Sequence, residues 1–585
     1  MPLSLIIIII CDTIQKMIVG LLYKIIKTED NMNQSYYKCA PLPSVEKPSF
    51  WSEDEVDFED RINLIRGLPQ RMESVFPIPD SMQTEYFNTP CTYPRLTDGK
   101  TGTLDYLDPA WHHAFGGLAR SIYYDLTNTS TVTGYSIGFL YSPGLWIKPP
   151  KSVRFDASEN GTDWEELDKS ITQYSPDGDI RVEVNVTLDK PRKARFVRIY
   201  FPVGPHVYID EIKVFGTKAI SPDALGIVPT PIIKKEMPNK FASPDDLGGI
   251  SNIILTYTCS YPEVRRGRHS VEDLLPFVGY YDENDTLSDT YFDSYLFLPC
   301  TSRAPSGAAM QAGNLIFSDW QYYIDDQYAT GSNIPALEQA VEQVKNELRI
   351  DDYKVNVFLS ILRPMVDQHD FGDIDGSGVS LDFSILEHRK RAVKWIIDEQ
   401  LRRFEESSFK NLKLWGFYWY EESIDGDDDE EMSLLKYTTD YIRSLGYKSI
   451  WIPYYQAQGF NQWAQFGFDS ACLQPNYMFN ATATESRVYE CADLAKLLGM
   501  CVEMEIDARS ITQPEWRARY IAYLRGGVKT GYMREGIKMY YQEAAPGVFY
   551  NAYKSDDPLV RAVYDNTYLF SKNALTEEII DKTMY

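Results

Sequence analysis

Residues 501–507, with the sequence CVEMEID, predict a β-strand that carries apolar side chains on one face and acids on the other. Successive side chains along a strand point in opposite directions. The apolar face holds Val502, Met504 and Ile506, and the opposite face holds Glu503, Glu505 and Asp507. Burial of carboxylates is costly unless they are paired or used. Three acids on one inward face therefore indicate a function rather than packing.

Seven further apolar runs have the composition of strands, and helical segments separate them. The eight runs are 252–258, 292–299, 354–364, 412–420, 449–457, 471–479, 501–507 and 538–544. Helices are predicted over 385–406, from an apolar stripe, and over 431–445 and 484–498, which end at Gly446 and Gly499. Eight strands that alternate with helices predict an α/β fold, a parallel (β/α)8 barrel of the TIM type.

The run at 412–420 has the same two-sided pattern. The side chains at odd-numbered positions, Trp415, Phe417 and Trp419, are expected to face the helices. The even-numbered positions, with Gly416, Tyr418, Tyr420 and Glu422, are then expected to face the barrel interior. Sites in such barrels lie at the carboxyl ends of the strands. Glu422 rather than Glu421 is therefore the expected inward acid, although a bulge near the end of the strand would exchange them.

Four motifs in this region resemble a bacterial family, domain of unknown function family 4855. They are GFYW at 416–419 followed by acid, WIPY at 451–454, QPNY at 474–477 and EMEID at 503–507. The resemblance spans about 250–550 and implies a glycosidase-type barrel. Retaining glycosidases of the large barrel clan place the acid/base after strand four and the nucleophile after strand seven, which implies Glu422 and Glu505 as the catalytic pair. Glu421 stands where that clan has Asn.

Glycoside hydrolysis needs two carboxyls that flank the bond, about 5 Å apart for retention of configuration and about 6.5–9.5 Å apart for inversion. One of them must hold its proton near neutral pH, which burial or a second carboxylate favours. Asp507 is the alternative nucleophile, and Trp419 and Trp463 are either stacking rings or core residues. The expected substrate-binding residues are Tyr418, Tyr420, Glu421, Tyr454, Gln456, Gln474, Asn476, Glu503, Asp507 and Tyr541.

The region before the barrel, about 85–217, contains shorter β runs. The segments 96–99, 158–164, 194–200 and 210–216 resemble the discoidin, or coagulation factor 5/8 type C, family. The resemblance implies an all-β jelly-roll sandwich, a fold whose members often bind glycans through loops at one end and often hold a structural calcium. One stretch of the sandwich contains Trp111, His112, His113 and Arg120. These side chains either face a ligand, or Trp111 packs into the sandwich and the histidines lie on its surface.

The composition limits the classes of partner. The chain has 585 residues, enough for two or more domains, and a formal net charge of -26, which disfavours nucleic acid and strongly anionic glycans. The apolar runs at 3–10 and 17–23 are shorter than a membrane span. The 42 Tyr and 11 Trp suit either sugar stacking or β-rich packing. Carbohydrate is the expected partner, and neither nucleic acid nor a membrane is expected.

No cofactor is expected apart from a possible calcium in the sandwich. The sequence has no CxxC, HExxH or GxGxxG motif, and its eight cysteines are typical of small hydrophobes in a reducing compartment. The segment 370–384 opens like a calcium loop but ends in Ser384 where Glu is needed.

The favoured function is hydrolysis of an oligo- or polysaccharide. The open alternatives are a non-catalytic glycan-binding protein and a barrel enzyme of another class, such as a lyase.

The sequence divides into six segments. They are a leader at 1–31, an extension at 32–84 with a short helix within 52–68, the sandwich at 85–217, a proline-rich linker at 218–248, the barrel at 249–555, and a C-terminal helix and tail at 556–585. Residues 28–32 can be encoded with a bacterial ribosome-binding sequence just before the codon for Met32. We therefore expect Met32 as the true start, and with that start a cytoplasmic protein.

Overall fold

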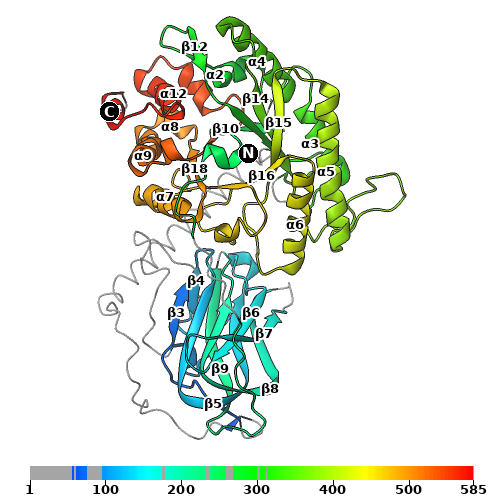
Figure 1. The fold of residues 1–585 in the computed structure, drawn as a ribbon, viewed down its shortest axis with the longest axis vertical. Helices are drawn as coiled ribbons and strands as arrows, with labels where there is room; N and C mark the ends of the chain where they lie inside the picture. Colours follow the sequence, from blue (N-terminus) through cyan, green and yellow to red (C-terminus); the bar gives the residue numbers. More distant parts are fainter. Residues whose placement is uncertain are drawn as a thin grey trace, which may run out of the picture. The chain divides into compact units, whose positions relative to one another are not determined.

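The computed structural model describes residues 56–57, 61–74, 95–173, 178–204, 206–230, 237–258, 268–299, 303–310 and 313–583. Within these ranges the chain forms an all-β domain and a closed barrel surrounded by helices (Figure 1). The predicted leader at 1–31 lies outside the described residues, as do five of the cysteines; the other three, Cys472, Cys491 and Cys501, are buried and free. No helix of the described part is long and apolar enough to cross a membrane.

The all-β domain is an antiparallel arrangement of nine strands. They are β1 (Val56–Asp57), β2 (Arg61–Asn63), β3 (Arg71–Ser74), β4 (His112–Phe115), β5 (Arg120–Tyr141), β6 (Ser152–Ser158), β7 (Glu165–Ile171), β8 (Ile180–Phe201) and β9 (His206–Thr217). The long strands β5 and β8 pair along most of their length. The paired part of these strands carries many buried side chains, among them Ile137, Phe139, Val197 and Ile199.

The predicted helix within 52–68 is wrong for the part of it that the structure describes. Residues 56–57 and 61–63 are strands, and Ile62 of β2 pairs with Gly216 of β9. Leu64 and Ile65, which follow β2, are buried. Pairing with an existing sheet edge outweighs the weak local helical pattern. The all-β domain therefore begins well before residue 85.

The barrel consists of eight parallel strands that close on themselves. They are β10 (Asn252–Thr258), β13 (Ser294–Pro299), β14 (Val355–Ile361), β15 (Leu412–Trp419), β16 (Lys448–Trp451), β17 (Ser470–Leu473), β18 (Cys501–Glu505) and β19 (Lys538–Tyr541). Six of the strands lie within the runs predicted from the sequence, and β16 and β17 begin one residue before theirs. Pairing of β10 with β19 closes the ring.

Helices lie around the outside of the strands (Figure 1). They are α2 (Val271–Val278), α3 (Phe317–Gln327), α4 (Asn333–Leu348), α5 (Leu386–Ser407), α6 (Asp429–Ser444), α7 (Ser486–Leu498), α8 (Arg509–Thr512), α9 (Pro514–Thr530), α10 (Tyr532–Glu535), α11 (Val548–Tyr553), α12 (Pro558–Ser571) and α13 (Glu577–Thr583). The connection from β16 to β17 departs from the pattern, because it contains only a short 3-10 helix, Phe460–Gln462.

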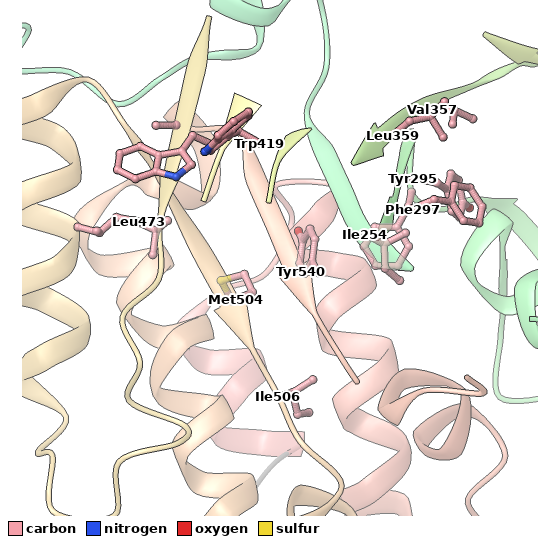
Figure 2. Packing of buried hydrophobic residues seen from close by; sticks show 14 of the residues in the cluster. Ile254, Tyr295, Phe297, Val357, Leu359, Trp419, Leu473, Met504, Ile506 and Tyr540 are labelled. Carbon is pink, nitrogen blue, oxygen red and sulfur yellow. The ribbon is translucent and has the colours of Figure 1, made fainter. Parts of the chain in front are cut away.

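The strand side chains alternate between an outer layer under the helices and an inner layer within the barrel. Figure 2 shows part of the outer layer, including Ile254, Phe297, Trp419 and Met504. The inner layer holds Ile253, Leu296, Phe358, Ile450, Cys472, Cys501 and Met539. On β18 the alternation confirms the prediction that Val502 and Met504 face outward.

The last part of the predicted linker is not an extended connection. Pro244–Leu247 form a 3-10 helix, and Ala242, Leu247 and Ile250 pack against the inner layer. The backbone N–H of Ala242 donates to Met500, and that of Ile537 donates to Ala242. This segment contacts the residues at the amino ends of the strands, so it closes that end of the barrel, and solvent reaches the interior from the other end.

A β-bulge in β15 changes the parity that the sequence predicts. Val357 pairs with Leu414 and Phe358 with Gly416, so Trp415 has no partner residue on β14. Trp415 packs against the inner layer and donates its Nε1–H to the carbonyl of Leu247. Its predicted place under the helices is therefore wrong. After the bulge the predicted alternation holds, because Phe417 and Trp419 lie in the outer layer and Tyr418 in the inner one.

We expect Gly416→Ala to destabilise the barrel, because a Cβ there would lie 2.2 Å from the carbonyl oxygen of Lys448 on β16. Forcing these strands apart should lower the free energy of unfolding by about 1–3 kcal/mol, measured by urea denaturation. Gly144→Ala is the control, because no atom lies within 4 Å of its added Cβ. Equal stability of the two variants would contradict the described register.

Candidate active site

A cavity of about 450 Å³ opens at the carboxyl ends of the barrel strands. Seven of the eight strands or the loops that follow them contribute to its wall, and β14 is the exception. Its floor is apolar, formed by Leu255, Leu298 and Ile452. Above the floor, the wall carries tyrosine rings and three acids, Glu421, Glu422 and Glu503.

Glu422 lies on the wall of the cavity, three residues beyond the end of β15, where solvent reaches its side chain. Gln474, just after β17, donates its Nε2–H to Glu422 Oε1 at 2.9 Å and to the carbonyl of Ile452 at 2.9 Å. Enclosure by the cavity wall raises the pKa of Glu422 to about 7, against the lowering effect of the Gln474 hydrogen bond, and the charge of Glu421 raises it further. This carboxyl can exchange its proton near neutral pH.

Glu503 lies deeper in the same cavity, on β18, with 2% of its surface exposed. It has no hydrogen-bond or ion-pair partner among the described residues. Burial raises its pKa well above the ordinary value, and the charges of Glu505 and Glu422 raise it further. Both effects favour the protonated, uncharged form of the Glu503 carboxyl.

Glu505 is fully buried at the end of β18 and does not line the cavity. Tyr523 of α9 donates its hydroxyl proton to Glu505 Oε2. Burial raises the pKa of Glu505 to about 8, although the Tyr523 hydrogen bond and the backbone N–H groups of Asn476 and Tyr477 lower it. Glu505 therefore does not reach the cavity in which its predicted partner Glu422 lies, because α9 and the loop after β17 enclose its carboxyl.

The neighbouring Glu421 is neutralised by the protein itself. Arg363, which follows β14, forms an ion pair with Glu421 at 2.9 Å and also contacts Glu431 at 3.1 Å. The indole N–H of Trp451 donates to the carbonyl of Glu421 at 2.6 Å, which fixes the backbone next to Glu422. Glu421 thus belongs to an ion-pair network at the cavity edge, and Glu422 carries no such cation partner.

Three of the strand ends around the cavity have an unusual backbone. Gln456, Asn476 and Glu543 follow β16, β17 and β19 and have φ angles of 67°, 51° and 65°. Residues other than glycine adopt this left-handed region rarely, and such strain clusters at functional sites. Its recurrence beside one cavity supports a functional role for this end of the barrel.

The sequence matches the model of a known family over this region. Residues 252–569 match the family described as domain of unknown function (DUF4855). The chain belongs to this family. Before the DUF4855 barrel, residues 81–210 match the F5/8 type C domain, which identifies the all-β domain as discoidin-like. A comparison with proteins of curated function gave no match.

Similar solved structures align with about a quarter of the DUF4855 chain. A chitosan-binding module of a chitosanase/glucanase from Paenibacillus sp. IK-5 is 20% identical, with 26% of this chain and 98% of that chain covered and a TM-score of 0.19. The C-terminal domain of a chitobiase from Bacteroides fragilis is 22% identical, with coverage of 28% and 100% and a TM-score of 0.19. At these TM-scores the likenesses carry no argument about this chain.

The structure brings together most of the residues that the sequence singled out in the DUF4855 barrel. Those that line the cavity are Tyr418, Tyr420, Glu421, Glu422, Tyr454, Gln474, Glu503 and Tyr541. Glu505, Asp507, Gln456 and Asn476 do not line it. Asp507 instead pairs with Arg509, whose guanidinium stacks on Trp516. Trp419 and Trp463 are packing residues rather than stacking platforms for a ligand.

Sequence reasoning missed five residues of the cavity, namely Leu255, Tyr257, Leu298, Ile452 and Phe479. Tyr257 could have been found, because it shares the inward parity of Ile253 and Leu255 on the first strand. Phe479 gave no such signal, since it lies in the loop after β17. Phe479 is 39% exposed and meets Tyr541 edge-on, with 5.2 Å between ring centroids.

The discoidin-like domain buries two of the four residues that the sequence left between ligand binding and packing, Trp111 and Arg120. Trp111 is buried and donates its Nε1–H to the carbonyl of Thr103 at 2.9 Å. Arg120 is buried and donates to backbone carbonyls of Leu118 and Phe115. His113 contacts His206 at 3.0 Å, and burial lowers its pKa to about 3. Trp111 and Arg120 therefore pack within the domain, whereas His112 and His113 are partly exposed.

The calcium ion that the discoidin resemblance implies for the sandwich stays a prediction. Glu211 is buried, with one carboxylate oxygen accepting from the N–H of Gly99 and the other 3.6 Å from the guanidinium of Arg66. The positive charge beside this carboxylate is thus supplied by Arg66. The described residues contain no group of three His, Cys, Asp or Glu side chains that could hold a metal.

The predicted calcium-like loop at 370–384 lies away from the cavity. The carboxylate of Asp373 accepts hydrogen bonds from the backbone N–H groups of Gly376 at 2.9 Å and Gly378 at 2.6 Å. The Gly378 hydrogen bond, with further hydrogen bonds from Asp375 and Ser377, lowers the pKa of Asp373 to about 2. The loop lines a separate hollow of about 560 Å³ against α3 and α5, where Asp325 pairs with Arg403.

Proposed function

We propose that the protein is a glycoside hydrolase of the TIM-barrel type, with Glu422 and Glu503 as the two carboxyls that act on the bond. The observation that carries the proposal is their presence in one tyrosine-lined cavity at the carboxyl ends of the strands. Both carboxyls have a raised pKa, and neither is paired with a cation of the described protein. Structural acids are normally paired, as Glu421 and Asp507 are.

The environments of the two carboxyls suggest different roles. Glu422 lies on the wall, exchanges its proton near pH 7, and suits the general acid that protonates the departing sugar oxygen. Glu503 lies deeper and suits the second carboxyl, which attacks the anomeric carbon directly or activates water. Burial raises the pKa of Glu503, and the charges of Glu505 and Glu422 raise it further, so the proton occupancy of Glu503 depends on the ionisation of Glu422.

The remaining wall is suited to a sugar ring. Tyr257, Tyr418 and Tyr541 present aromatic surface around Glu503, and Phe479 adds an exposed ring at the edge. Aromatic faces pack against the C–H faces of sugars, while phenol hydroxyls orient sugar hydroxyls. The discoidin-like domain would then hold the glycan or serve as a spacer.

The test is a screen of the purified protein against plant and bacterial oligosaccharides and aryl glycosides, with released sugar as the readout. Cleavage of at least one substrate by the wild type supports the proposal. If the protein binds a glycan but cleaves none of the substrates, a non-catalytic glycan-binding protein is favoured. An unsaturated product, detected by its ultraviolet absorbance, would show a lyase instead.

We expect Gln474→Met to move the alkaline limb of the pH–activity profile to higher pH. The Gln474 amide donates to Glu422 and stabilises its ionised form, so removal of this bond raises the pKa of Glu422 above about 7. A hydrogen bond to a charged group corresponds to a shift of about one pH unit. The pH dependence of kcat/KM measures it; an unchanged alkaline limb would exclude Glu422 as the acid.

A further inference from the structure

The two acting carboxyls lack a positive counter-charge from the described protein. Glu421, the third acid of the wall, is paired with Arg363. Glu422 is hydrogen-bonded only by the neutral amide of Gln474, and Glu503 has no partner among the described residues. The described residues that line the cavity include no Lys, Arg or His. A ligand that supplies a positive charge would complete this cavity.

Aromatic rings surround the deeper of the two carboxyls. Tyr257, Tyr418 and Tyr541 line the same cavity as Glu503. The charge of Glu503 contributes to the raised pKa of all three tyrosines. Tyr257 and Tyr541 meet edge-on at 5.5 Å between centroids. Rings that enclose a carboxylate form the setting in which proteins bind ammonium groups, because the ring faces attract a cation.

A metal ion fits this setting less well than an ammonium group. Magnesium and calcium require six or more oxygen ligands at fixed distances. Here the surfaces next to Glu503 are tyrosine rings and the apolar floor of Leu255, Leu298 and Ile452. The described residues contain no cluster of three side chains that could ligate a metal.

We propose that the substrate is an amino sugar with a free, protonated amine, whose ammonium group binds between Glu503, Glu422 and the tyrosine rings. This inference rests on the proposed function and specifies its substrate class. A sugar ring supplies the C–H faces that the aromatic wall can cover, and its ammonium supplies the charge that the carboxyls lack. An N-acetylated sugar fills similar space without the charge.

Ligand binding should then release a proton. In the free protein, burial and the charges of Glu505, Glu422 and Cys501 raise the pKa of Glu503 and favour its protonated form. The rings of Tyr257, Tyr418 and Tyr541 line the same cavity. An ammonium beside Glu503 favours the carboxylate, so the carboxyl proton passes to solvent as the ion pair forms. The ionised Glu503 is also the form that can attack or activate water.

Calorimetry with matched ligand pairs tests the inference. The ligands are the methyl glycosides of glucosamine and galactosamine and the β-1,4-linked glucosamine tetramer, each with its N-acetylated counterpart, at pH 6. We expect at least one free-amine form to bind about tenfold or more tightly than its counterpart. Titration in two buffers of different ionisation enthalpy should show proton release for the amine form alone.

Two variants and one control ligand sharpen the test. Glu503→Gln should abolish both the preference for the amine and the proton release, while Glu505→Gln, which removes a carboxyl outside the cavity on the same strand, should keep the preference. Spermidine is the control for a cation without a sugar ring. Spermidine binding as tight as that of the amino sugars would overturn the inference, as would equal binding of all amine and N-acetyl pairs.

The screen for hydrolysis separates this inference from the proposed function. Cleavage of neutral oligosaccharides without any preference for amines would leave the hydrolase standing and overturn the amino-sugar inference. Amine-selective, Glu503-dependent binding with no cleavage would support the amino-sugar site and overturn the hydrolase.

Discussion

Replacement of Glu422 or Glu503 by Gln is expected to remove most of the hydrolytic activity, with kcat/KM falling about 10²–10⁴-fold. Gln keeps the shape of each side chain but can neither donate a carboxyl proton nor attack as a carboxylate. Both positions face the same cavity, and neither holds a structural cation partner among the described residues. The kinetics are measured on whichever glycan the wild type cleaves.

The control for this prediction is Glu505→Gln, which removes an acid just two residues from Glu503. Because Glu505 is enclosed by Tyr523 and the loop after β17, we expect the variant to keep most of the activity. Circular dichroism and thermal unfolding show whether each variant is folded. If Glu505→Gln loses as much activity as Glu503→Gln, the second catalytic carboxyl is Glu505, as the family resemblance implied.

The stability of the protein is expected to fall as pH rises from about 5 to 8, and Glu505→Gln should reduce that fall. Burial raises the pKa of Glu505 from an ordinary 4.5 to about 8, so the folded state binds more protons than the unfolded state within this window. Stability therefore decreases with rising pH. One pKa unit corresponds to about 1.4 kcal/mol, so the effect at pH 8 reaches several kcal/mol.

Urea denaturation at pH 5 and pH 8 measures this effect in wild type and variant. The free energy of unfolding of the variant should be closest to that of wild type near pH 5, where Glu505 is protonated in the folded state. At pH 8 the variant should be the more stable of the two, relative to their difference at pH 5. Glu342→Gln, on the exposed face of α4, is the control and should leave the slope unchanged. Parallel slopes for wild type and Glu505→Gln would show that Glu505 is not buried as described. The raised pKa values of Glu422 and Glu503 likewise lower the stability of the folded protein as pH rises.

The alternation of side chains along the strands was enough to predict the barrel and the inward acid of β18. Val502 and Met504 lie in the outer layer and Glu503 in the cavity, as the parity requires. Burial of apolar side chains under helices fixes this parity, because a shift by one residue would place acids in the apolar layer. The same reasoning found Tyr418 and Glu422.

Predictions from local sequence patterns were wrong where a distant part of the chain pairs with a residue or hydrogen-bonds to it. The bulge at Trp415 arises from pairing with β14 and from the Leu247 carbonyl, which the sequence of β15 does not encode. The segment near Ile62 forms strands because β9 offers an unpaired edge. In both places distant contacts outweigh local preference.

The sequence by itself determined which side chains face inward, since strand periodicity and the cost of buried charge depend only on the order of residues. Only the tertiary structure decided which inward acids line the cavity. Glu503 and Glu505 share a strand and a parity, yet Tyr523 of α9, eighteen residues along the chain, encloses one of them and leaves the other in the cavity. Arg363 likewise neutralises Glu421 and leaves Glu422 without a cation. Pairing of a charge depends on neighbours that folding brings together, which is why the sequence predicted the acidic face but not which of its acids line the cavity.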